Sequence, residues 1–226
     1  MRQEELFPGE KGHIGTDESG KGDYFGPLVV AGVFLPDSQK LVLQEFGVKD
    51  SKRFSDNRVR ELAELIKNGY KYSVVSIGPE KYNNLYEKLR NMNRILAWAH
   101  ARVIENLLEE VSCMLAITDQ FGDKLYVTNA LMKRGKAIEL IQRPKAEADM
   151  AVAAASILAR AEFLKRLHFL SQDIGCELPK GSSSRTEEVG LKLVQKHGVQ
   201  ILDKAAKKHF KITARILQVA GKLHGQ

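Results

Sequence analysis

Cysteine is scarce in this sequence, and its scarcity excludes two classes of protein. Only two cysteines occur, Cys113 and Cys176, and neither stands at the spacing of a metal-binding motif. Two thiols are also too few for the disulfide framework of a small secreted domain. We therefore expect free thiols in a reducing compartment and a cytoplasmic protein.

Long apolar runs and targeting segments are missing as well. No run approaches the roughly 20 apolar residues that a membrane helix needs. The first residues, MRQEELFPGEKG, are polar and charged, unlike a signal peptide. The sequence shows no internal repeat and no low-complexity linker. We expect one domain over residues 1–226 with a short extension at 1–11, no membrane association and no obligate protein partner.

The charge of the chain is weighted toward the positive side. Thirty-five Lys and Arg against 28 Asp and Glu give a net charge of +7, and hydrophobic residues make up 43% of the chain. That hydrophobic share suffices for a sizeable core. The basic excess is compatible with a nucleic-acid or nucleotide partner, but it is too modest to establish one by itself.

The pattern of apolar residues predicts an α/β fold. Five segments rich in Val, Ile or Leu are typical of strands, at 12–17, 28–35, 70–77, 114–119 and 137–142. Apolar residues at helical spacing predict helices after Ser55, which is a suitable N-cap, over 93–111 and over 148–170. A basic helical tail follows from about Arg185. Strands that alternate with long helices favour an α/β architecture.

One stretch near the start, GTDESGKG at 15–22, raises a specific question. It differs by one residue from a phosphate-binding P-loop, whose final Ser or Thr holds a magnesium ion. Gly22 stands in that place, and the following Tyr-Phe-Gly-Pro breaks a helix where a P-loop needs one. Asp17 and Glu18 would also repel a phosphate in the absence of a cation. We therefore reject the P-loop interpretation.

The same letters fit a metal site built from carboxylates. Asp17 and Glu18 end a strand, Asp119 ends the strand MLAITD, and Glu147 starts an Ala-rich helix. Hard divalent cations prefer such oxygen ligands, and two-metal phosphoryl chemistry needs several of them. A solvated Gly-rich turn is the simple alternative for the first pair. Asp149 rivals Glu147, since acids are common at helix starts for electrostatic reasons.

The sequence resembles the type 2 ribonuclease H family, and within it the ribonuclease HIII branch. GTDESGKGDYFGPLVVAGVF is similar to the first motif of that branch, and the DYFGP part separates it from ribonuclease HII. Similar matches follow in order along the chain, at KDSKRFSD (49–56), NMNRILAWAHAR (91–102), ITDQFG (117–122), KAEADMAVAAASILAR (145–160), LPKGSSSR (178–185) and AKKHFKIT (206–213).

The resemblance implies a fold, a site and a cofactor. The fold is the ribonuclease H-like mixed five-stranded sheet flanked by helices, here with a helical C-terminal extension. The four catalytic and metal-binding carboxylates fall on Asp17, Glu18, Asp119 and Glu147. The substrate-binding residues fall on Gly20, Lys21, Gly22, Ser51, Lys52 and Lys145. The cofactor is Mg²⁺, with Mn²⁺ as an alternative.

The implied activity is hydrolysis of the RNA strand of an RNA–DNA hybrid, leaving 5′-phosphate and 3′-hydroxyl ends. Two alternatives stay open: junction-type cleavage at single ribonucleotides in duplex DNA, and non-catalytic hybrid binding. The segment SSSR at 182–185 lacks the Tyr with which ribonuclease HII stacks on a DNA–RNA junction. Ribonuclease HIII proteins usually carry an N-terminal substrate-binding domain, and only about a dozen residues precede the first expected strand here. We therefore expect either a natural short form or a catalytic fragment.

The remaining candidate residues have simpler interpretations. The lysines at 204–211 form either a phosphate contact or a solvated helix face. Trp98, His100 and His209 are expected to pack or to lie on the surface rather than to bind metal.

Overall fold

The computed structural model describes residues 11–48 and 54–224. Contacts between residues divide the chain into two compact units. The first unit comprises the described parts of Met1–Glu18, Val30–Val75 and Met92–Ala161, and the second those of Ser19–Val29, Ser76–Asn91 and Glu162–Gln226. The single domain expected over the whole chain stays a prediction.

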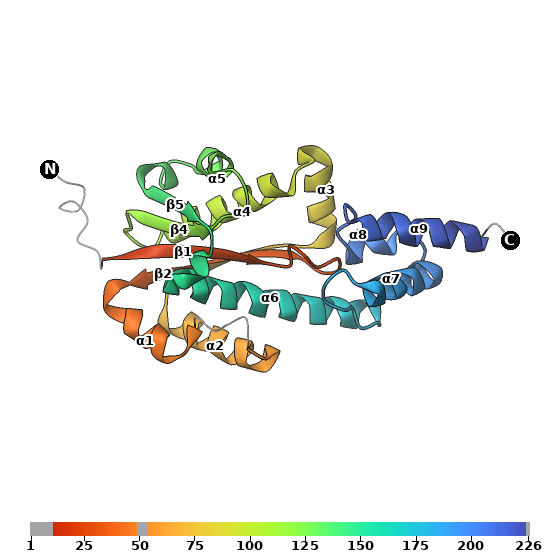
Figure 1. The fold of residues 1–226 in the computed structure, drawn as a ribbon, viewed down its shortest axis with the longest axis horizontal. Coiled ribbons are helices and arrows are strands. Elements are labelled where there is room, and N and C mark those ends of the chain that lie inside the picture. Colours follow the sequence, from red (N-terminus) through yellow and green to blue (C-terminus); the bar gives the residue numbers. More distant parts are fainter. Residues whose placement is uncertain (1–10, 49–53, 225–226) are drawn as a thin grey trace. The chain divides into compact units, whose positions relative to one another are not determined.

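A mixed five-stranded sheet forms the centre of the first unit (Figure 1). Its order is β3-β2-β1-β4-β5. The strands are β1 (Gly12–Ser19), β2 (Leu28–Pro36), β3 (Tyr72–Ile77), β4 (Leu115–Asp119) and β5 (Glu139–Arg143). All five predicted strands are therefore confirmed, with ends shifted by no more than two residues. β2 is buried along its whole length, which explains why its sequence is an unbroken apolar run.

Two helices cover opposite faces of this sheet. They are α4 (Met92–Leu107) and the first part of α6 (Met150–Ile174). Glycines permit the close approach on each side. A Cβ on Gly32 of β2 would lie 2.4 Å from Val103 of α4, and a Cβ on Gly15 of β1 would lie 2.2 Å from the backbone of Val152 in α6. Side chains at even and odd positions of β1 therefore face different helices.

The remaining helices of the first unit are shorter. They are α1 (Lys40–Glu45), α2 (Asp56–Gly69) and α5 (Lys124–Ala130). The same unit contains the 3₁₀ turns η2 (Asp37–Gln39), η4 (Gly135–Ala137) and η5 (Ala146–Ala148). The predicted cap of α2 is confirmed, since the Ser55 hydroxyl accepts the N–H of Arg58 at 3.3 Å. The apolar stripe of α2 is buried as expected. α1 and α5 were not predicted, because each buries a single residue and shows no apolar period.

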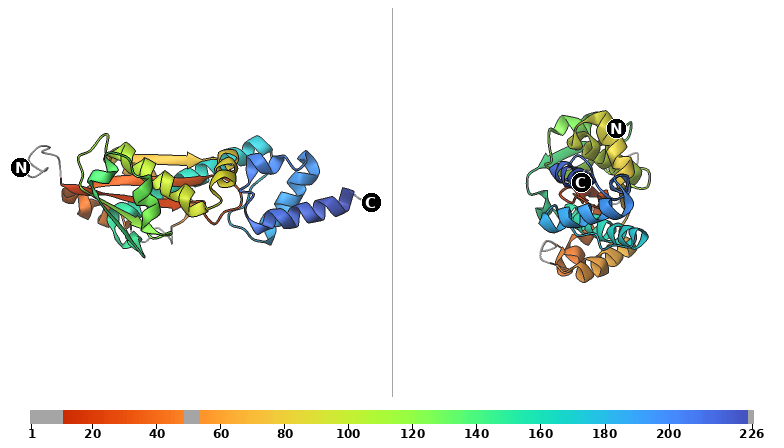
Figure 2. Two further views of the ribbon diagram at one scale, coloured as in Figure 1. Left: turned by 90° about the horizontal axis from the view of Figure 1, so that it is seen from above. Right: turned by 90° about the vertical axis from the view of Figure 1, so that its right-hand side faces the viewer.

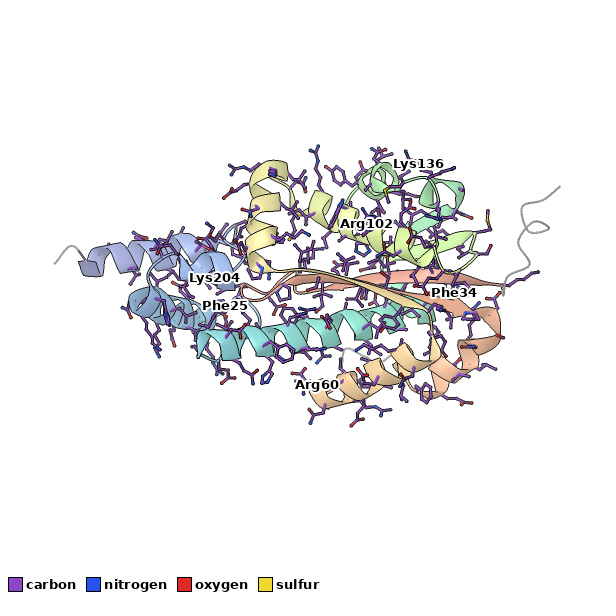
Figure 3. The ribbon with its side chains drawn as sticks, turned by 180° about the vertical axis from the view of Figure 1, so that it is seen from behind. Phe25, Phe34, Arg60, Arg102, Lys136 and Lys204 are labelled. Carbon is purple, nitrogen blue, oxygen red and sulfur yellow. The ribbon has the colours of Figure 1, made fainter. Side chains whose placement is uncertain are left out.

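The second unit contains a group of helices from two separate parts of the chain (Figure 2). They are α3 (Pro79–Leu89), α7 (Ser184–His197), α8 (Ile201–Ala205) and α9 (Lys211–His224). α7 packs against α8 and α9, and α3 against α8. The segment after β1 joins them through an antiparallel bridge between Phe25 and Ala206, beside Lys204 (Figure 3). The predicted helical tail is confirmed, although α3 was not foreseen.

Membrane insertion finds no support among these elements. Within residues 11–48 and 54–224, none of the helices combines the length and the apolar character that a bilayer-spanning helix needs.

Candidate active site

The ends of two parallel strands bring three acids to one edge of the sheet. β1 pairs with β4 in parallel, with Thr16 opposite Thr118. Because parallel strands end at the same edge, Asp17 and Glu18 of β1 arrive beside Asp119 of β4. β5 continues the parallel arrangement. The sheet register thus places three of the four predicted carboxylates in one neighbourhood.

Asp17 faces α6, and the pKa of its carboxyl group is strongly raised. Its carboxyl group makes a hydrogen bond with the Ser156 side chain of that helix. Burial, together with the nearby charges of Glu18 and Asp119, raises the pKa of Asp17 to about 7, against the lowering effect of the hydrogen bonds. A carboxyl group crowded by two others is an arrangement that a divalent cation would stabilise.

Glu18 is adjacent to Asp17 but faces the other side of the sheet, as alternation along a strand requires. One of its carboxylate oxygens, Oε2, lies 3.4 Å from Nε2 of His100 in α4. The other ring nitrogen of His100, Nδ1, lies 2.8 Å from the hydroxyl of Thr16 and 3.3 Å from that of Thr118. His100 is buried, which agrees with one of the two expected roles, packing or surface, and its ring also contacts a predicted catalytic acid.

Asp119 fixes the position of the turn that carries Glu147. Its Oδ1 accepts the backbone N–H of Ala146 at 3.1 Å, which ties η5 to the end of β4. Ala146 itself is buried in a cluster with Ile117 and Val152. Glu147 follows this anchored residue and is partly exposed. The structure therefore places Glu147 next to a residue bound by Asp119.

Asp149, the rival of Glu147, is engaged elsewhere. Both of its carboxylate oxygens lie 2.9 Å from Nε2 of His13. Oδ1 also accepts the backbone N–H groups of Ala151 and Val152, at 2.9 and 3.3 Å, and so caps α6. Burial opposes ionisation, but the bonds from His13 and the backbone hold the pKa of Asp149 below its usual value. Asp149 thus has a structural partner set of its own.

The side chains do not form a closed ligand cluster as they stand. Over the ranges 11–48 and 54–224, there is no group of three or more His, Cys, Asp or Glu side chains gathered closely enough to hold a metal ion. The opposite orientations of Asp17 and Glu18 account for part of this. The donor set nevertheless fits a hard divalent cation, since it consists of carboxylate oxygens, and burial together with the neighbouring acids raises the pKa of Asp17.

The predicted Gly20-Lys21-Gly22 loop lies in the second unit. Gly20 has φ +86°, and a Cβ there would lie 2.2 Å from the carbonyl oxygen of Pro27, so only glycine fits. A Cβ on Gly22 would meet open space. A turn and then β2 follow this loop, and no helix begins there. This agrees with the rejection of the P-loop interpretation.

The chain after this loop is held by the C-terminal part of the second unit. Lys207 is fully buried, and its ammonium group donates to the carbonyl oxygen of Gly26 at 2.7 Å. Asp23 accepts the N–H of Gly181 at 2.6 Å. Burial lowers the pKa of Lys207 to about 7, against the raising effect of Asp23. The lysines at 204–211 were expected to contact phosphate or to form a solvated helix face. Lys207 does neither, because its side chain is fully buried.

The other predicted substrate-binding residues differ in how well they are placed. Lys145 is exposed and adopts a left-handed backbone with φ 55°, directly before η5. Ser51 and Lys52 lie outside the described residues. His209 packs between aromatic rings, with its centroid 4.5 Å from that of Tyr86, as expected of a packing residue.

Sequence reasoning missed the residues that hold the acids. Ser156 is the one hydroxyl in AVAAASILA, an otherwise apolar stretch of α6, and that isolation is a signal. Thr16 and Thr118 each precede a predicted catalytic acid in the sequence. Their shared contact with His100 becomes visible only after the strands are paired.

Comparisons with known proteins agree with the motifs. The family model of Ribonuclease HII matches residues 14–213. Ribonuclease HIII of Protochlamydia amoebophila is 49% identical over 210 residues, which cover 93% of this chain and 70% of that protein. Ribonuclease HIII of Chlamydia felis is 43% identical over 201 residues, covering 88% and 67%.

Solved structures show the same relationship. The crystal structure of Bst-RNase HIII in complex with Mn²⁺ matches with a TM-score of 0.87 at 30% identity, covering 95% of this chain and 71% of that one. The expected ribonuclease H-like sheet, flanking helices and C-terminal helices are thereby confirmed. From its motifs, its strand-end acids and these matches, the chain belongs to the ribonuclease HII family and is similar over most of its length to ribonucleases HIII.

Proposed function

We propose that this protein hydrolyses the RNA strand of RNA–DNA hybrids by two-metal chemistry, leaving 5′-phosphate and 3′-hydroxyl ends. Family membership makes it a ribonuclease H, a metal-dependent endoribonuclease. The observation that carries the proposal is the position of Asp17, Glu18 and Asp119 at the ends of two paired strands, where burial and the neighbouring charges of Glu18 and Asp119 raise the pKa of Asp17 to about 7. Such crowding of acids is costly to the fold, and it is typical of functional sites.

Asp17, Glu18, Asp119 and Glu147 are the residues that would hold the ions. When bound, a pair of divalent cations lowers the pKa of a water and stabilises the charge on the leaving oxygen. Mg²⁺ is the ion we propose, and the Mn²⁺ in a related ribonuclease HIII structure supports a divalent cation of this kind. The Asp17 carboxyl must release its proton to act as a ligand, and Ser156 holds that carboxyl in place meanwhile.

Two kinds of contact hold the substrate in our proposal. The backbone of Gly20-Lys21-Gly22 lies against ribose 2′-hydroxyls, which distinguish RNA from DNA. The positive charges of Lys21, Lys52 and Lys145, together with Ser51, contact phosphates. The exposed Lys145 and the sterically open Gly22 are consistent with this role.

The test is a cleavage assay on two substrates, with and without Mg²⁺. One is a uniform RNA–DNA hybrid and the other a DNA duplex with a single ribonucleotide. We expect metal-dependent cutting with a much higher kcat/KM on the hybrid, and products that a ligase joins without prior phosphorylation. Equal or better cutting of the single ribonucleotide would assign the protein to the junction-specific class. Hybrid binding without metal-dependent cleavage would make it a non-catalytic binder.

A further inference from the structure

His100 is a buried, polar side chain for which the mechanism above gives no role. It lies in α4 with 0% of its surface exposed. Its ring stacks on Phe121, with the centroids 4.8 Å apart and the planes 20° from parallel. Nδ1 lies 2.8 Å from the Thr16 hydroxyl and 3.3 Å from the Thr118 hydroxyl. Stacking and hydrogen bonding together fix both the plane of the ring and its rotation.

The second ring nitrogen is directed at an acid of the site. Nε2 of His100 is buried, has no hydrogen-bond partner among the described residues, and lies 3.4 Å from Oε2 of Glu18. If Nδ1 carried the proton, the lone pair of Nε2 would face a carboxylate oxygen and repel it. A Thr16 hydroxyl that donates to Nδ1 leaves the proton on Nε2, the ring nitrogen that lies 3.4 Å from the Glu18 carboxylate.

The contacts of His100 also join the two strands that carry the acids. Thr16 of β1 directly precedes Asp17, and Thr118 of β4 directly precedes Asp119. One imidazole therefore contacts the last residue before each of these acids, besides Glu18 itself. A shift of the ring would be transmitted to both strand ends.

We propose that His100 is a positioning residue for Glu18. Its Nε2–H orients the Glu18 carboxylate, and its Nδ1 is kept as an acceptor by the Thr16 hydroxyl. The inference rests on the proposed function, in which Glu18 is a metal ligand. Partners of metal ligands orient those ligands, and their loss costs about 10–100-fold in metal affinity or activity.

Two substitutions of His100 separate positioning from packing. In His100→Asn the amide replaces Nδ1 toward the two threonines but is too short to reach Glu18. In His100→Gln the amide extends to the place of Nε2. We expect His100→Asn to weaken Mn²⁺ binding in calorimetry about 10–100-fold and to lower kcat with little change in KM for hybrid. His100→Gln should recover a large part of both losses.

A second pair of variants tests the same inference without changing the imidazole. Thr16→Val removes the hydroxyl that directs the tautomer, whereas Thr16→Ser keeps it and is the matched control. Thr16→Val should weaken Mn²⁺ binding more than Thr16→Ser does. Both are conservative in size, so they keep the question open to measurement if the His100 variants fail to fold.

The inference is overturned if His100→Asn and His100→Gln lose Mn²⁺ affinity equally, in proportion to their loss of melting temperature. It is also overturned if Thr16→Val and Thr16→Ser bind Mn²⁺ alike. Failure of the proposed function has a different signature, because the unaltered protein would then neither bind Mn²⁺ at this site nor cleave hybrid.

Discussion

The carboxylates of Asp17 and Glu18, neighbours in the chain, are held by helices on opposite faces of the sheet. Asp17 makes a hydrogen bond with Ser156 of α6, and Glu18 lies 3.4 Å from Nε2 of His100 in α4. Alternation along β1 imposes this division. The two acids are therefore supported independently, and changes at one helix should affect one acid more than the other.

Asp17→Asn should abolish cleavage and leave hybrid binding intact or stronger. The change removes one negative charge that would attract the ions and also repel phosphate. Loss of a residue that only supports a metal ligand lowers metal affinity or activity about 10–100-fold. We therefore expect loss of the ligand Asp17 itself to lower activity more than about 100-fold. Single-turnover cleavage and a binding titration on the same preparation measure both. Activity above a few per cent of the unaltered protein would refute the role of Asp17.

Glu147→Gln should reduce catalysis far more than Asp149→Asn does. Glu147 follows the residue that Asp119 binds, whereas Asp149 is occupied by His13 and by the first turn of α6. Asp149→Asn should instead lower stability by about 1–2 kcal/mol through the weakened cap and ion pair. Denaturant unfolding and kcat, measured for both variants, decide the matter. Equal loss of kcat with folding preserved would leave the fourth ligand unassigned.

The pH dependence of stability should reveal the raised pKa of Asp17. In the folded protein this pKa is about 7, against an ordinary value of 3.8. The folded state therefore binds more protons between these values, so the free energy of unfolding falls as pH rises from about 4 to 7. The difference between the unaltered protein and Asp17→Asn, measured with a chelator present, isolates this contribution. Its slope cannot exceed about 1.4 kcal/mol per pH unit. A flat difference over that window would contradict the prediction.

Lys207→Met should change stability with the opposite pH dependence. The pKa of Lys207 is lowered from 10.5 to about 7, so the unfolded chain binds more protons between these values. The free energy of unfolding of the unaltered protein should then rise with pH from about 7 to 10 relative to Lys207→Met. Because the variant leaves the Gly26 carbonyl without its donor, it should also lose about 1–3 kcal/mol near pH 9. Lys204→Met, at an exposed position, is the matched control.

Parts of this structure that depend on local pattern were predictable from the sequence. The strands were recognised because β-branched and apolar runs end at Gly, Pro or acids, and α2 because Ser55 precedes a clear apolar stripe. α3 was missed although Pro79 stands at its start, since its buried residues include the polar Asn83. The strand-end acids were found because Asp119 is out of place at the end of an apolar strand.

Parts that depend on which elements meet could not be predicted in this way. The partnership of His100 with Glu18 requires knowing that α4 covers the face to which even positions of β1 point. The burial of Lys207 depends on its contact with Gly26, which lies more than 180 residues earlier in the chain. Neither leaves a periodic signal around the residue itself.

The left-handed backbone of Lys145 has a consequence for protein engineering. A residue with a Cβ costs about 1 kcal/mol or more at such a φ, and glycine does not. A library selected only for heat resistance would be expected to enrich glycine at this position. A library selected for turnover at raised salt would keep the cation, if Lys145 contacts phosphate as we propose. Deep sequencing of the two pools would show opposite preferences at this codon. Thermal stability and substrate binding would then favour different residues at position 145.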